Sequence, residues 1–116
     1  MASRAVRALA ERSVGQNVPP AAVRAAARRG LEMFKNGEAG DGLEPATVVR
    51  ARRIAAGESL SHDHVARMYS FFERHDKTRP AADGGVGESP WRTAWMLWGG
   101  NPGRVWAASR AKGGRS

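Results

Sequence analysis

Three histidines are the side chains of this sequence best suited to metal binding or acid–base chemistry, and two of them flank an aspartate in the run His62-Asp63-His64. On a helix, positions i and i+2 point in different directions, so these side chains do not converge on one ion. His75 follows eleven residues after His64, but it brings no second carboxylate–histidine pair to complete a coordination shell. We therefore expect no metal site.

Nucleophilic catalysis needs a nucleophile, a base and an orienting group that can converge on one point. The serines lie at expected helix caps or near the termini, and no glycine-framed turn surrounds any of them. Glu73 and Asp76 flank His75, but neighbouring helix positions do not converge. The glycine-rich run 84–87 has no strand before it and no Lys-Ser/Thr after it, so it does not predict a phosphate-binding loop. We expect no enzyme activity, no cofactor and no small-molecule substrate.

Arginine supplies most of the charge, because 16 Arg and 3 Lys face 11 acidic residues and leave a net charge of +8. The surplus is concentrated at the two ends: residues 1–37 carry a net charge of +5, and residues 101–116 carry +4. Basic ends suit polyanions or acidic protein surfaces, and the guanidinium pairs in two-pronged fashion with carboxylate or phosphate. The predicted partner-contacting residues are Arg4, Arg7, Arg12, Arg110, Lys112 and Arg115.

A second basic set inside the chain raises the alternative of DNA binding. Residues 50–72 read as helix, turn and helix, which resembles a helix-turn-helix with a somewhat long turn. A recognition helix carries Arg, Lys, Asn or Gln in its first turns, whereas this second helix opens with His62-Asp63-His64. Contact with DNA phosphates, independent of base sequence, stays open for Arg28, Arg29, Arg50, Arg52 and Arg53.

We favour a simpler interpretation of residues 50–72, a hairpin of two helices that packs through its apolar side chains. In this hairpin Leu60, Val65 and Met68 pack against Ile54. Such packing explains the apolar spacing without any recognition of DNA bases.

The sequence predicts an all-α fold, a compact bundle of five or six short helices with flexible basic termini. β-Branched residues are scarce, and no stretch alternates apolar and polar residues in the manner of a strand. The expected helices cover residues 2–14, 20–35, 46–56, 61–75, 90–98 and 102–112. The predicted organisation is a basic arm or helix over 1–17, one helical domain over 18–110 and a flexible tail over 111–116.

Local signals support these helices. Pro20 and Pro45 lie where helices begin, and Ser61 is a good N-cap with an acidic residue in the first turn after it. For the helix over 20–35, the spacing of Val23, Ala27, Leu31 and Phe34 predicts the buried stripe.

The four tryptophans fall in one short stretch near the C-terminus. Trp91, Trp95 and Trp98 stand at i, i+4 and i+7, which places them on one face of a helix. A glycine pair then ends this helix and Pro102 begins another, so Trp106 can fold back onto the other three rings. The rings form either the core or a surface that another protein covers, and we favour the core. The predicted core residues are Trp91, Trp95, Trp98, Trp106, Phe72 and Met68.

Several pieces of the sequence together resemble a small helical module of tailed-phage and prophage structural and head-morphogenesis proteins. The specific pieces are RMYSFFERH over 67–75 and AWMLWGGNPGRVWA over 94–107, and weaker ones lie at 18–20, 26–31 and 51–57. The resemblance covers about three quarters of the chain. It departs at Asn101 and Pro102, where the family usually carries Asp and a small residue.

This resemblance implies a non-enzymatic virion protein associated with the phage head, as a minor capsid, cement or internal head protein. Its expected partners are capsid or other virion proteins and DNA, and its expected location is the virion and the host cytoplasm during assembly. The resemblance implies no catalytic residues. The longest apolar run is too short to span a bilayer, so we expect no membrane contact. The alternative function is a small helical DNA-binding protein, helix-turn-helix-like or architectural.

Overall fold

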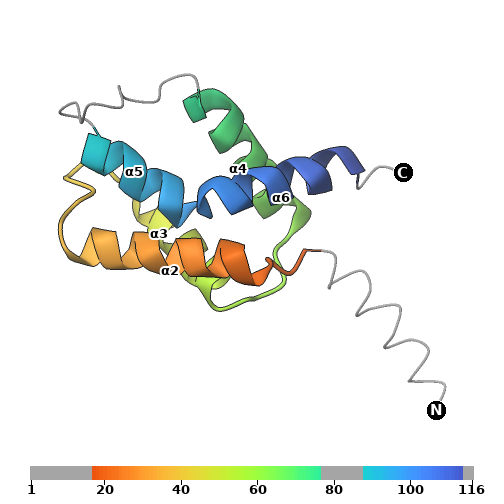
Figure 1. Cartoon of the computed structure of the whole chain (residues 1–116), viewed down its shortest axis with the longest axis horizontal. Helices are drawn as coiled ribbons and strands as arrows, with labels where there is room; N and C mark the ends of the chain where they lie inside the picture. Colours follow the sequence, from red (N-terminus) through yellow and green to blue (C-terminus); the bar gives the residue numbers. More distant parts are fainter. Residues whose placement is uncertain (1–16, 77–87, 114–116) are drawn as a thin grey trace, which may run out of the picture.

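The computed structural model describes residues 17–76 and 88–113, in which every regular element is a helix (Figure 1). The all-α prediction is therefore confirmed for these residues. The expected helix over 2–14, with Arg4, Arg7 and Arg12, lies outside the described residues, as does Arg115. The five helices are α2 (Ala21–Lys35), α3 (Pro45–Ala55), α4 (His62–His75), α5 (Glu88–Leu97) and α6 (Gly100–Gly113).

The helix ends follow from local chemistry. Proline begins two helices, with Pro20 as the N-cap of α2 and Pro45 as the first residue of α3. The Ser61 side chain accepts a 3.0 Å hydrogen bond from the backbone N–H of His64, which satisfies one free donor at the start of α4. After α2, Gly37 has a φ of +82°, and its N–H and that of the next residue donate to carbonyls of the last helical turn.

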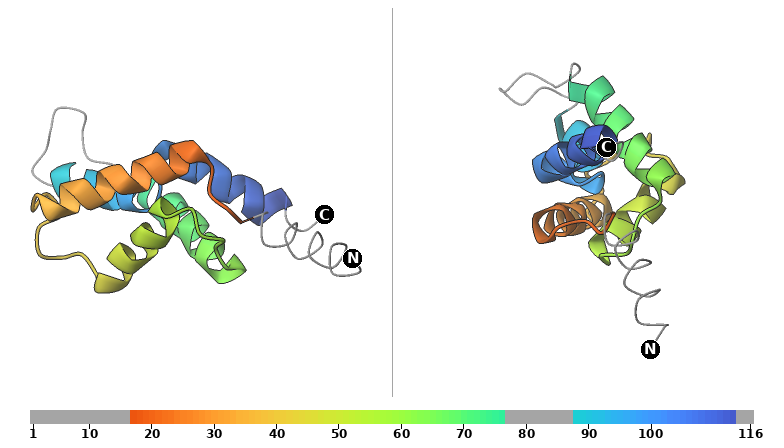
Figure 2. Two further views of the ribbon diagram at one scale, coloured as in Figure 1. Left: turned by 90° about the horizontal axis from the view of Figure 1, so that it is seen from below. Right: turned by 90° about the vertical axis from the view of Figure 1, so that its right-hand side faces the viewer.

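Helix α2 is the central packing element. It lies along α5 and α6 on one flank and contacts α3 on another, while α4 packs mainly on α6 (Figures 1 and 2). The connection between α3 and α4 is tied to the chain before α2, because the Leu60 N–H donates to the Asn17 carbonyl at 3.0 Å. Asn17 is itself buried, so the helical domain includes this residue, which the sequence analysis assigned to the arm.

The buried stripe of α2 differs from the predicted one. Leu31 is only partly buried and Phe34 is exposed, whereas Gly30 and Met33 are buried. Gly30 is the physical reason: a β-carbon there would lie 2.5 Å from the backbone nitrogen of Leu97. The missing side chain lets the end of α5 lie directly on α2, and this close contact turns the stripe toward Gly30.

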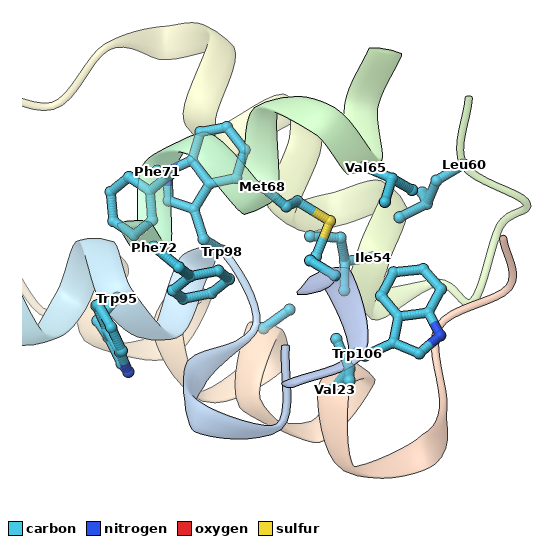
Figure 3. Close-up of a cluster of buried hydrophobic side chains, with 12 residues drawn as sticks. Val23, Ile54, Leu60, Val65, Met68, Phe71, Phe72, Trp95, Trp98 and Trp106 are labelled. Carbon is cyan, nitrogen blue, oxygen red and sulfur yellow. The ribbon is translucent and has the colours of Figure 1, made fainter. Parts of the chain in front are cut away.

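The turn between α5 and α6 also differs from the prediction. Gly99 and Gly100 have positive φ values of 117° and 64°, but the chain bends there instead of reversing, and α6 continues along α2 (Figures 1 and 2). Trp106 therefore does not fold back onto the other indoles. It lies at the opposite end of the core from Trp95 (Figure 3). The tryptophan segment is thus not a self-contained unit, because α2 and α4 complete its packing.

The core is one continuous cluster of apolar side chains from all five helices. Trp95, Trp98 and Trp106 are buried, together with Phe72 and Met68 (Figure 3). Trp91 is partly buried and packs against the cluster. Leu60, Val65 and Ile54 belong to the same cluster. The predicted pairing of α3 with α4 is not the main contact of α4, because α4 packs on α6 more than on α3.

Candidate functional site

A groove of about 650 Å³ lies between the α2–α3 connection, α3, α4 and α5. Its volume is in the range of ligand-binding sites in proteins. Its charged and polar lining comes mostly from α3 and α4, and its apolar lining comes from α4, α5 and the connection. The lining residues are Gly42, Leu43, Glu44, Thr47, Arg50, Ala66, Arg67, Ser70, Phe71, Arg74, His75, Ala94 and Trp98.

Helical spacing places the polar residues in the groove. Arg67, Ser70 and Arg74 stand at i, i+3 and i+7 on α4, so they share one face. Thr47 and Arg50 stand at i and i+3 on α3 and line the same groove. Two helices thus present three guanidinium groups to one hollow.

The three arginines of the groove have different partners. Arg67 donates from Nε to the Asp63 carboxylate at 2.7 Å, and this bond keeps the pKa of Asp63 below its ordinary value. The Arg50 guanidinium lies over the indole of Trp98, 5.7 Å from the ring centroid. Arg74 is exposed and forms no ion pair with a described carboxylate. Glu44 is the one acidic residue in the lining.

Trp98, whose ring lies under Arg50, also contacts two rings of α4. Phe71 stacks on its indole with the ring centroids 5.0 Å apart, and the His64 ring meets it edge-on at 6.4 Å. His64 is buried, and its Nε2 has no hydrogen-bond partner among the described residues. Burial lowers the pKa of His64 to about 4, helped by the positive charges of Arg50 and Arg53. His64 is therefore neutral at pH 7.

His75 lies where α4 ends beside the start of α5. Its ring packs on Phe71 with centroids 4.5 Å apart, and its backbone carbonyl accepts a 3.4 Å hydrogen bond from Nε1 of Trp91. Burial, with a contribution from Arg74, lowers the pKa of His75. A second hollow, which also includes Trp91, Pro90 and residues 39–43, shares His75 with the groove and extends it along α5.

The arginines considered for DNA binding have different surroundings in the structure. Arg28 donates to the Ala55 carbonyl at 3.2 Å, which satisfies the C-terminal end of α3. Arg50 turns into the groove, whereas Arg52 and Arg53 are exposed in the last turn of α3. Arg29 is exposed on α2. Arg28 thus lies at the end of α3 that carries Arg52 and Arg53, whereas Arg50 lines the groove.

The C-terminal arginine nearest the body is part of the fold. Arg110, one of the predicted partner contacts, lies on α6, partly buried, with its guanidinium 6.0 Å from the Trp106 ring centroid. Helix α6 runs on to Gly113 and includes Lys112. Arg110 is therefore part of the folded body, where its side chain packs beside Trp106.

Arg67, Ser70 and Arg74 were not predicted as a binding face. The signal was present in their spacing along α4, which puts them on one side of the helix. Arg50 and Trp98, which complete the groove, come from other helices. Only the tertiary fold brings them together.

The described residues give no sign of a metal or membrane site. Within 17–76 and 88–113, no group of three His, Asp or Glu side chains is placed to hold a metal ion. None of the described helices combines the length and apolar character needed to cross a membrane. Comparison with known protein families, curated proteins and solved structures finds no match to this chain.

Proposed function

We propose that this chain is a non-enzymatic structural protein of tailed-phage particles, associated with the head. The observation that carries the proposal is that the two most specific pieces of the phage-module resemblance pack together. Phe71 and Phe72 on α4 meet Trp98, which directly follows α5, and Trp95 on α5, with ring centroids 5.0 Å and 4.8 Å apart. The pieces are far apart in sequence, so their joint packing supports one module instead of two chance matches.

The proposed mechanism is docking. The aromatic core holds the five helices in fixed positions, and positive side chains on this frame pair with acidic surfaces of capsid or other virion proteins. The groove supplies Arg50, Arg67 and Arg74 from the folded body. The contacts predicted for Arg4, Arg7, Arg12, Lys112 and Arg115 remain part of the proposal, with packaged DNA as a further partner for these ends.

Particle association is the direct test. Phage particles from a host that expresses the full chain are purified on a density gradient and analysed by quantitative mass spectrometry. The proposal predicts a constant ratio of this chain to the major capsid protein across the particle peak. Absence of the chain from purified particles, with the chain present in the same lysate, would contradict it.

DNA binding is the second candidate, and one observation favours it. Arg52 and Arg53 are exposed side by side in the chain, and neither forms an ion pair with a described acid. Because phosphate contacts release counterions, duplex affinity should fall steeply as salt rises, and Arg52→Ala with Arg53→Ala should weaken it. Absence of duplex binding at low salt would rule this candidate out.

A further inference from the structure

The arginines that line the groove differ in their ion pairing. Neither Arg50 nor Arg74 forms an ion pair with a described carboxylate, whereas Arg67 is held by Asp63 at 2.7 Å. Arg50 and Arg74 come from different helices, so an anionic group between them would be gripped from two sides. Such an arrangement favours a carboxylate or a phosphate as the ligand.

Part of the groove lining is apolar, and this limits the chemical class of ligand that can fill the groove. Leu43, Phe71, Ala94 and Trp98 line it together with the arginines. A free inorganic anion would leave this surface in contact with water. An occupant that uses the whole groove therefore carries both anionic and apolar groups.

The geometry around Trp98 favours a protein over a single-stranded nucleic acid. Nucleic-acid grooves bind bases by stacking them on open aromatic faces. The Trp98 ring already has Phe71 stacked on it and Arg50 over it, and the residue is only 8% exposed. Glu44 also lines the groove, where it would repel a continuous phosphate backbone, whereas a peptide can turn a backbone N–H toward it.

We propose that this groove binds an acidic segment of a partner protein. Carboxylates of the segment pair with Arg50 and Arg74, and an apolar side chain between them lies on Leu43 and Ala94, the partly exposed apolar residues of the lining. The inference rests on the proposed function, since it names the surface through which the folded body docks. It goes further by assigning the contact to the groove instead of the chain ends.

Fluorescence anisotropy with a labelled short peptide of alternating Asp and Leu residues tests the assignment on the full chain. The double variant Arg50→Gln/Arg74→Gln should lose about ten-fold in affinity or more. The matched control Arg29→Gln/Arg52→Gln changes the net charge equally on exposed positions outside the groove, and it should lose less than about two-fold. Equal losses in the two variants would overturn the assignment.

Two further measurements show whether the loss of affinity comes from unfolding and whether the carboxylates of the peptide are needed. Arg74→Gln alone alters an exposed side chain without a described partner, so it should leave the thermal unfolding midpoint unchanged and still weaken the peptide. A peptide with Asn in place of Asp should bind at least about ten-fold more weakly. Undiminished binding of the Asn peptide would overturn the proposal.

A labelled single-stranded DNA oligonucleotide provides the competing occupant. Tighter binding of the oligonucleotide than of the acidic peptide, lost in Arg74→Gln but not in Lys35→Gln, an equal charge change on an exposed position outside the groove, would assign the groove to nucleic acid and overturn the proposal. Oligonucleotide binding that is weaker than peptide binding and is the same in these two variants supports the proposal.

The particle and peptide measurements distinguish a wrong assignment of the groove from a wrong proposed function. Particles that retain the wild-type chain but lose Arg50→Gln/Arg74→Gln, and not the control, support both. Particles that retain the groove variant at the wild-type ratio overturn the groove assignment and leave the proposed function intact. Absence of the wild-type chain from particles overturns the proposed function, while the peptide measurement still decides the groove.

Discussion

Stability should fall as the pH is lowered below neutral, because His64 is buried in its neutral form. Its folded-state pKa is about 4, below the ordinary value of 6.5, so the unfolded chain takes up the proton first. The contribution of His64 is fully present above pH 6.5 and is lost between pH 6.5 and pH 4. Integrated over this window, the loss in unfolding free energy is at most about 3 kcal/mol.

The assay is thermal unfolding followed by tryptophan fluorescence at several pH values between 7 and 4, on the wild type and on His64→Leu. The Ser61 cap uses the backbone N–H of residue 64, so the variant keeps that hydrogen bond. In the wild type the thermal midpoint should drop by roughly 10–20 °C between pH 7 and pH 4. In His64→Leu most of this pH-dependent drop should be absent. His75, whose pKa is also lowered, leaves a smaller slope of the same sign in the variant.

Two results would refute this reasoning. One is a parallel loss of stability in the wild type and in His64→Leu. The other is an NMR titration in which the His64 ring of the folded protein takes up its proton near pH 6.5. Asp63, whose pKa is below its ordinary value of 3.8, acts only at lower pH and does not confuse the comparison.

The remaining predictions concern packing and caps, each read out by urea unfolding at pH 7. Gly30→Ala should destabilise by about 2 kcal/mol or more, because its β-carbon meets backbone of α5 at 2.5 Å, while Gly42→Ala, with open space around it, should change stability by less than about 1 kcal/mol. Ser61→Ala should cost about 1 kcal/mol through the lost cap. Asn101→Ala should cost about 1 kcal/mol because Asn101 Oδ1 accepts a 2.9 Å hydrogen bond from Trp95 Nε1, whereas Asn101→Asp keeps the acceptor. A stable Gly30→Ala, or equal effects of the two Asn101 variants, would contradict these accounts.

The hydrogen bond at Asn101 also bears on the resemblance to phage-module proteins. The family usually carries Asp at this position, and a carboxylate oxygen there could accept from the Trp95 indole as the amide oxygen does. The departure therefore preserves the acceptor that ties α5 to α6.

Much of the fold could be predicted because its signals are local. Pro45, Ser61 and the glycines after the helices act on their own segments, and the helix bounds follow them closely. The buried stripe of α2 and the position of Trp106 could not be read in this way. Both depend on how closely α5 approaches Gly30, which is a contact between residues far apart in the chain.

The groove illustrates the same limit for the site. Arg67 and Arg74 share a face of α4 by their spacing alone, so the α4 side of the groove could be predicted from the sequence. Arg50 and Trp98 join them only through packing of α3 and α5 against the rest of the bundle. The predicted arm residues Arg4, Arg7, Arg12 and Arg115 lie outside the described residues and remain predictions.

A cryo-electron-microscopy reconstruction of the purified phage particle tests the central claim most directly. The account predicts density for the bundle of α2 to α6 on the head, with the groove around Arg50 and Arg74 closed by an acidic segment of a virion protein. A head that contains no such density, in particles from cells that express the chain, would contradict the account.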